Sequence, residues 1–282
     1  MRMKKIILFG AIIILTFDCS RSYEFYLKTG LRYRQLENHE RAVRFLTRAI
    51  NLSNEDAQVF IYRGHSYFML KKYDNAIADL NNAISLDNNN EEAYFWRGRV
   101  FNQMGKYNDA VADFAMAIKL NDSEAYNYYW RAVAYQELDK IDLAIVDFTT
   151  VIEINNIFPH IYRKRARLYF ALSDLERAGA DLKRAIEVNP NDLDAYVLFA
   201  SINMAEEQWE LALENLSYVI NRNPNYFSND IRAKKGMIYF LRGGIYAHLN
   251  ERDKAIADLK TAVSMGFEEA SVGLKFYGIV YP

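Results

Sequence analysis

Apolar residues recur along most of the chain at three- and four-residue spacing, which places them on one face of a helix. Short polar links, such as LKKYDN at 70–75 and MGKYND at 104–109, separate neighbouring apolar stretches. Asparagine- or proline-containing segments, such as NNN at 88–90 and NPND at 189–192, follow the second stretch of most pairs and favour turns. The pattern therefore predicts an all-α chain built from pairs of helices.

The pattern itself repeats with a period of 34 residues, as comparison of 57–90 with 125–158 shows. The twentieth position of each repeat is alanine, as in Ala76 and Ala110, and the eighth is glycine or alanine, as in Gly64 and Gly98. Such small residues let two helices cross closely. Seven repeats follow, with an insertion at 227–235, and they occupy residues 23–56, 57–90, 91–124, 125–158, 159–192, 193–226 and 236–269.

The period and the recurring small and aromatic positions resemble the tetratricopeptide repeat, or TPR. The resemblance implies a right-handed superhelical solenoid of seven helical hairpins, in which the first helix of each hairpin lines a concave groove. It also implies that the groove binds a peptide or a segment of another protein, and that no chemistry takes place there.

An arginine at the seventh position and an aspartate at the twenty-third occur together in five repeats and are both missing from the other two. Their joint presence predicts an ion pair, with the planar guanidinium giving the carboxylate two hydrogen bonds. The sequence leaves open whether each pair lies within one repeat or joins neighbours. A catalytic pair would occur once, so we expect structural pairs, namely Arg63 with Asp79, Arg97 with Asp113, Arg131 with Asp147, Arg165 with Asp181 and Arg242 with Asp258.

The TPR resemblance implies that the second, fifth, ninth, twelfth and thirteenth positions face the groove. The family's clamp for a terminal carboxylate is not matched, because Gln58, Ile61, Glu92 and Phe95 occupy its basic positions. The alternative is that some residues at these positions bind no partner and are simply the solvent-facing side chains of the first helices. The candidate partner-binding residues in the middle of the chain are Ile61, His65, Phe68, Phe95, Arg99, Asn102, Tyr129, Val133, Gln136, Arg163, Arg167 and Phe170.

The first nineteen residues differ from the repeats, because basic residues precede an uncharged run from Ile6 to Phe17. That run suits the core of an export signal and is shorter than a membrane span. Cys19 is the only cysteine, and 1–19 resembles a bacterial lipoprotein signal in which this cysteine is lipidated. Asp18 departs from that resemblance, since a small residue is usual there. An ordinary signal peptide or an uncleaved anchor is the alternative.

Two further segments interrupt the regular pattern. The insertion at 227–235 contains Ser228, a plausible N-cap, so the next helix could begin about two and a half turns early. The tail at 270–282 is mostly apolar, and we expect it to cap the exposed end of the last repeat, with a contact to another chain as the alternative.

Composition narrows the classes of function. Thirty-five basic residues against thirty-six acidic ones give no electrostatic reason to expect a nucleic-acid partner. We find no motif for catalysis, metal binding or phosphate binding, and expect no enzyme activity, cofactor, metal site or small-molecule substrate.

These features together predict a scaffold or adaptor tethered to the membrane through its N-terminus, with a protein or peptide ligand in its groove. If Cys19 is lipidated, the chain is exported and anchored at the cell envelope, on the periplasmic side or the outer membrane, where TPR lipoproteins commonly serve assembly or maintenance. The alternative is a soluble or signal-anchored regulatory TPR protein that mediates intracellular protein interactions.

Overall fold

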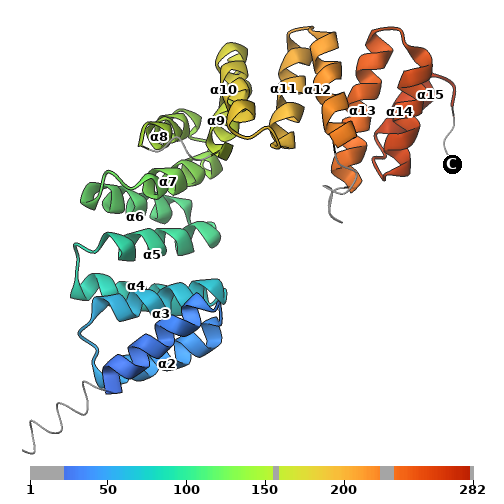
Figure 1. Ribbon diagram of the computed structural model, residues 1–282. Coiled ribbons are helices and arrows are strands. Elements are labelled where there is room, and N and C mark those ends of the chain that lie inside the picture. Colours follow the sequence, from blue (N-terminus) through green and yellow to red (C-terminus); the bar gives the residue numbers. More distant parts are fainter. Residues whose placement is uncertain (1–21, 155–158, 223–231, 280–282) are drawn as a thin grey trace, which may run out of the picture. The chain divides into compact units, whose positions relative to one another are not determined.

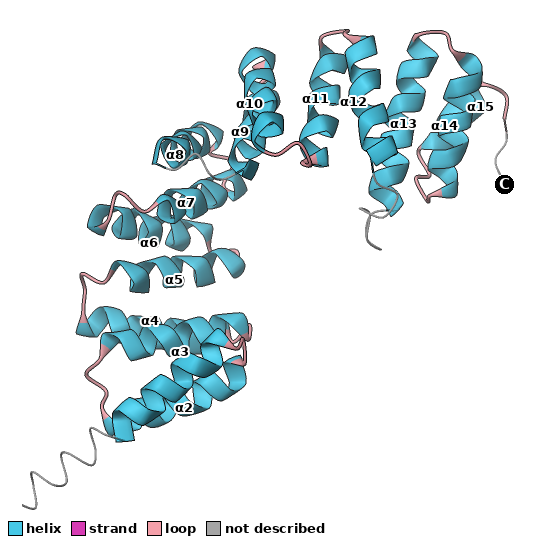
Figure 2. Ribbon diagram, in the orientation of Figure 1, coloured by secondary structure: helices cyan, strands magenta, loops and turns pink. Residues whose placement is uncertain are grey.

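The computed structural model describes residues 22–154, 159–222 and 232–279, and every regular element in these ranges is a helix (Figure 2). The chain divides into an N-terminal unit, which ends at Asn155, and a C-terminal unit, which begins at Asn156. In each unit, consecutive helices pack as antiparallel pairs (Figure 1). The all-α solenoid that the sequence predicts is confirmed.

The N-terminal unit contains four helical hairpins, which begin with a helix over residues 22–35 paired with α2. Its further helices are α2 (His39–Leu52), α3 (Ala57–Met69), α4 (Tyr73–Leu86), α5 (Glu91–Gln103), α6 (Tyr107–Leu120), α7 (Ala125–Glu137) and α8 (Ile141–Ile154). The helices of the C-terminal unit are α9 (Pro159–Ala171), α10 (Leu175–Val188), α11 (Leu193–Ala205), α12 (Trp209–Arg222), α13 (Arg232–His248), α14 (Arg252–Ser264) and α15 (Ala270–Phe276).

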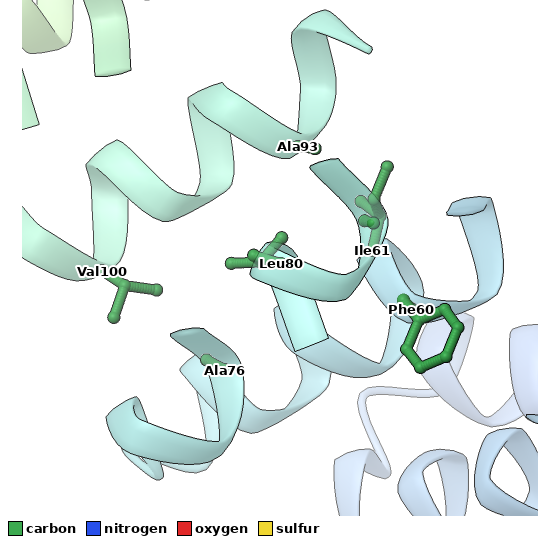
Figure 3. Close-up of a cluster of buried hydrophobic side chains, with 7 residues drawn as sticks. Phe60, Ile61, Ala76, Leu80, Ala93 and Val100 are labelled. Carbon is green, nitrogen blue, oxygen red and sulfur yellow. The ribbon is translucent and has the colours of Figure 1, made fainter. Parts of the chain in front are cut away.

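The hydrophobic core continues from one hairpin to the next within a unit. The small eighth residue lies against the large twenty-fourth residue of the same hairpin: a Cβ placed on Gly98 would come within 2.9 Å of the Phe114 ring. This close approach explains why the position is restricted to glycine and alanine. Figure 3 shows how α3, α4 and α5 contribute to one cluster, through Phe60, Ile61, Ala76, Leu80, Ala93 and Val100.

The turn between the two helices of a hairpin has the same backbone conformation in every repeat. Its fifteenth residue has a positive φ, for example 58° at Lys71 and 72° at Gly105. The next amide, that of Lys72, donates to the carbonyl of Tyr67 at 2.9 Å, five residues back, which is the bond of a Schellman motif. Only one of the seven repeats places glycine at this position; the others have Glu37, Lys71, Asp139, Ser173, Glu207 and Asn250.

The first helices of successive hairpins form a layer of their own within each unit. In the N-terminal unit α3 packs against α5 and α5 against α7, and in the C-terminal unit α9 packs against α11. No contact of comparable extent joins α4 to α6 in the part of the chain that the structure describes. We call the surface formed by the helix over 22–35, α3, α5 and α7 the inner face of the N-terminal unit.

The structure describes the helix that follows the insertion and most of the tail. Helix α13 begins at Arg232, four residues before the repeat does, while Ser228 lies outside the described residues. Helix α15 packs against α14, and its Ala270 and Leu274 are fully buried, whereas the Phe276 side chain is 86% exposed. The described part of the tail therefore covers the apolar surface of the last hairpin.

Candidate functional site

All five arginine–aspartate pairs are present, and each lies within one hairpin. Arg97 of α5 donates from Nε to Asp113 Oδ2 at 2.8 Å and from Nη2 to Oδ1 at 2.7 Å. The carboxylate is the more buried partner, with 8% of the Asp113 side chain exposed against 21% for Arg97. The same two bonds, at 2.6–2.8 Å, join Arg63 to Asp79, Arg131 to Asp147, Arg165 to Asp181 and Arg242 to Asp258.

Some of these arginines also reach the preceding repeat, which the sequence pattern had left open. Arg97 Nη1 donates to Asn81 Oδ1 at 2.7 Å, and Arg63 Nη1 donates to Thr47 Oγ1 at 3.0 Å. Asn81 and Thr47 occupy the twenty-fifth position of their repeats. Arg63 and Arg97 therefore each hold their own hairpin together and link it to the one before.

Other contacts replace the pair where it is missing. In the first repeat Phe45 stacks on Tyr33, with ring centroids 5.4 Å apart. In the sixth repeat Asn215 Nδ2 donates to Asn203 Oδ1 at 3.0 Å. Phe199 stands there in place of the arginine and, with Gly179 of α10, lines a cavity of about 420 Å³.

The predicted groove residues fall into three environments. Ile61 is fully buried in the core between α3 and α5 (Figure 3), so the prediction that it contacts a partner is wrong: the neighbouring repeat already covers its side chain. Arg167 is exposed. The remaining candidates are half-buried on first helices, namely His65, Phe68, Phe95, Arg99, Asn102, Tyr129, Val133, Gln136, Arg163 and Phe170.

The three candidate arginines are not equivalent. Arg163 donates from Nε to Asp192 Oδ2 at 2.9 Å and lies 3.5 Å from Asp194, so two carboxylates already balance its charge. Asp192 also caps α11 by accepting from the amide of Ala195. Arg163 therefore connects two repeats of the C-terminal unit. Arg99 has no such carboxylate.

Arg99 belongs to a cluster of cations and aromatic rings on the inner face of the N-terminal unit. Its guanidinium carbon lies 3.6 Å from the centroid of the Trp130 ring and 5.5 Å from that of Phe68. The His65 ring is 4.2 Å from Trp96, and His65 Nδ1 is 3.3 Å from Arg34 Nη2. We call this set the arginine–aromatic cluster: Arg34, Tyr62, His65, Phe68, Trp96, Arg99 and Trp130.

Only His65, Phe68 and Arg99 of this cluster are among the groove residues that the sequence predicts. Arg34 is at the twelfth position of the first repeat, which is a groove position, but it lies outside the middle repeats that contain the predicted residues. The aromatic rings come from the sixth position, where Tyr62, Trp96 and Trp130 follow one another in three successive repeats. That recurrence was a usable signal, and it lay outside the positions that the resemblance implies.

The repeat geometry agrees with a match to known families. The model described as "TPR repeat" matches residues 64–105, and two models described as "Tetratricopeptide repeat" match 175–242 and, separately, 23–56, 91–124, 125–158 and 238–265. Together they cover more than half of the chain. It is a tetratricopeptide repeat protein. A search among curated proteins found no match to this TPR protein.

Solved structures show the same fold at low sequence identity. The C-terminal part of a TPR protein from Cytophaga hutchinsonii is 16% identical with a TM-score of 0.73, and the match covers 85% of this chain and 95% of that one. A TPR protein from Parabacteroides merdae is 19% identical with a TM-score of 0.62, covering 89% and 97%. YrrB, described as a TPR protein with an unusual peptide-binding site, is 22% identical with a TM-score of 0.57, covering 64% and 93%.

The described residues of the TPR protein lack two further features. Among them, no helix has the length and apolar character needed to cross a membrane. The same residues include no group of three or more His, Cys, Asp or Glu side chains placed to hold a metal ion.

Proposed function

We propose that this TPR protein is a membrane-tethered scaffold that binds a segment of another protein on the inner face of its N-terminal unit, in assembly or maintenance of the cell envelope. Membership of the TPR family supports the scaffold role, because TPR proteins are generally non-enzymatic interaction scaffolds. The tether rests on the sequence of residues 1–19, where Cys19 follows an apolar run. The proposal gives the chain a binding function and no reaction.

The observation that carries the proposal is the arginine–aromatic cluster. Aromatic rings and arginine are enriched in protein interfaces, and Trp, Tyr and Arg are the side chains that most often dominate the binding energy there. Phe68, Trp96 and Trp130 are half-buried and lie around a single guanidinium, that of Arg99. A partner segment laid along the first helices would bury the remaining surface of these rings.

Site-specific photocrosslinking in intact cells tests the binding surface. A photoreactive residue replaces Phe68 on the inner face, and a matched control replaces Lys119 on α6, a second helix. We expect a partner protein to be captured from position 68 and not from position 119. Equal capture from both positions, or none from position 68, would contradict the proposed surface.

Mass spectrometry of the mature N-terminus tests the tether in the same sample. An acylated Cys19 supports attachment to the envelope membrane. An intact Met1 contradicts lipidation and directs the partner search to the alternative, an anchored or intracellular regulatory TPR protein. An unmodified new N-terminus beyond residue 19 contradicts tethering and leaves an exported soluble scaffold.

A further inference from the structure

Two arginines of α5 have opposite electrostatic surroundings although they are only two residues apart. The bidentate bond to Asp113 raises the pKa of Arg97, against the lowering effect of burial. Burial lowers the pKa of Arg99 to about 10, because no carboxylate lies close enough to offset it. Arg99 makes no hydrogen bond or ion pair with any residue in the described ranges, and its Nε is buried without a partner. The charge of Arg99 is thus unbalanced where that of Arg97 is neutralised.

Aromatic rings hold the Arg99 guanidinium without satisfying its donors. Trp130 lies against one face at 3.6 Å, and the rings of Phe68 and Trp96 are 5.5 and 5.7 Å away. Contacts of this kind stabilise the cation through the ring electrons and fix the guanidinium plane. A guanidinium has five N–H donors at its edge, and rings that lie over its face accept none of them. Arg99 is therefore oriented and still able to give a carboxylate two hydrogen bonds.

Arg34 supplies a second cation in the same cluster. Its guanidinium lies 4.6 Å from the Tyr62 ring centroid, its Nε is buried without a partner, and burial lowers its pKa. It borders a cavity of about 410 Å³ that is also lined by Leu31, Gln35, Tyr62 and His65. His65 connects the two arginines, since it contacts Arg34 and experiences the charges of both Arg34 and Arg99.

The arginine–aromatic cluster has a net positive charge even when the neighbouring ionisable side chains are counted. Burial, followed by the charges of Arg34, His39 and Arg99, lowers the pKa of His65 to about 4, so this ring is neutral at pH 7. Glu92 is the carboxylate that acts on Arg34, and it is already engaged, since it accepts from Gln58 Nε2 at 2.7 Å and Trp96 Nε1 at 3.2 Å. Two arginines thus face one carboxylate, in a chain whose overall formal charge is −1.

We propose that the arginine–aromatic cluster binds an acidic segment of the partner protein, with an aspartate or glutamate side chain paired to Arg99 and a second acidic group near Arg34. The inference rests on the proposed function and specifies the ligand of the same face. A ligand carboxylate would convert Arg99 from an unbalanced cation into a paired one, with the hydrogen bonds donated by the two Nη groups because Nε is buried. Apolar side chains of the segment would then cover Phe68 and Trp130.

The cluster contains its own fluorescent reporter. The chain has three tryptophans, of which Trp96 and Trp130 lie in the cluster, so Trp209→Phe leaves fluorescence that reports only on this site. The probe is hexaglutamate with an acetylated N-terminus and an amidated C-terminus, so that all its carboxylates are side chains. Capped hexaglutamine, of the same length and without charge, is the matched control peptide.

In the full-length Trp209→Phe protein we expect hexaglutamate to change the tryptophan fluorescence saturably and hexaglutamine to have no effect. Arg99→Gln should weaken hexaglutamate binding at least about tenfold, and Arg34→Gln should weaken it by a smaller factor. Arg44→Gln, an exposed arginine on the second helix α2, should leave it unchanged. Circular dichroism melts confirm that each variant is folded.

Three results would overturn the inference. Hexaglutamate could give no saturable change, Arg99→Gln could bind it as well as the parent, or free glutarate could bind as tightly as the peptide, which would indicate a site for a small dicarboxylate. The crosslinking experiment separates this failure from failure of the scaffold. If a partner is captured equally from position 68 in the Arg99→Gln background, the scaffold proposal stands and the acidic-ligand proposal fails. If hexaglutamate binds through Arg99 but no partner is captured, the acidic-ligand site stands and the scaffold proposal fails.

Discussion

Arg97 and Asp113 are joined by two hydrogen bonds, of 2.8 and 2.7 Å, between the two helices of one hairpin. The guanidinium also reaches Asn81 of the preceding repeat. This one side chain therefore connects three helices, α4, α5 and α6. Arg99 lies on the same helix and connects aromatic rings of successive first helices instead, so α5 carries one arginine for the scaffold and one that is open to a ligand.

Loss of one member of the pair should destabilise the protein. Arg97→Met leaves Asp113 buried without its cation, and we expect the free energy of unfolding to fall by about 2–3 kcal/mol, below the usual cost at a deep site because Arg97 is 21% exposed. Urea unfolding followed by circular dichroism measures this. The double variant Arg97→Met with Asp113→Leu should lose less than the single variant. Equal losses would show that the two side chains do not stabilise each other.

Arg99→Met tests the contrast between the two arginines. Removal of an unbalanced, partly buried charge is favourable, while loss of the stack on Trp130 is unfavourable, and a thioether packs well against aromatic rings. We therefore expect the free energy of unfolding to change by less than about 1 kcal/mol. A loss as large as that of Arg97→Met, measured in the same urea titration, would mean that Arg99 is part of the scaffold.

The turn of the hairpin predicts two opposite effects at equivalent positions. Lys71 has a φ of 58°, which a residue with a Cβ adopts only at a cost, so Lys71→Gly should stabilise the protein by about 0.5–1 kcal/mol. Gly105, with a φ of 72°, already occupies this position in the third repeat, and Gly105→Ala should destabilise it by about 1 kcal/mol. Thermal melts of both variants check the signs. Changes of the same sign in both would contradict the conformational argument.

His65 should make stability depend on pH. Its pKa is lowered from 6.5 to about 4 in the folded state, so between these values the unfolded chain binds a proton that the folded chain does not. The contribution of neutral His65 to the free energy of unfolding is therefore complete above about pH 6.5 and is lost as the pH drops toward 4. We expect this loss to be about 1–2 kcal/mol, because the ring is partly exposed. Urea titrations at pH 7, 5.5 and 4.5 should show a smaller loss in His65→Gln. The same slope in both proteins would falsify the assignment to His65.

The repeat pattern predicted the hairpins because the contacts that hold the two helices of a hairpin together lie within one repeat. The small eighth residue is set by a helix crossing within one repeat, as the close approaches at Gly30, Gly64, Gly98 and Gly243 show, and the same requirement recurs in the sequence with every repeat. The pairing of Arg97 with Asp113 could be inferred for the same reason. The positive φ at the turn could not, since only Gly105 shows it by its residue type.

The binding face was harder to predict because it depends on which side chains meet between repeats. Ile61 follows the groove spacing, yet the next hairpin covers it completely. Arg163 and Arg99 are both candidate groove cations, but only Arg163 is neutralised, by Asp192 at the end of its own repeat and by Asp194 of the following one. The sequence by itself determined the period, the helix pairs and the local ion pairs, because short-range spacing encodes them. Only the tertiary structure decided which arginine keeps an unbalanced charge, because that depends on burial and on neighbours supplied by other repeats.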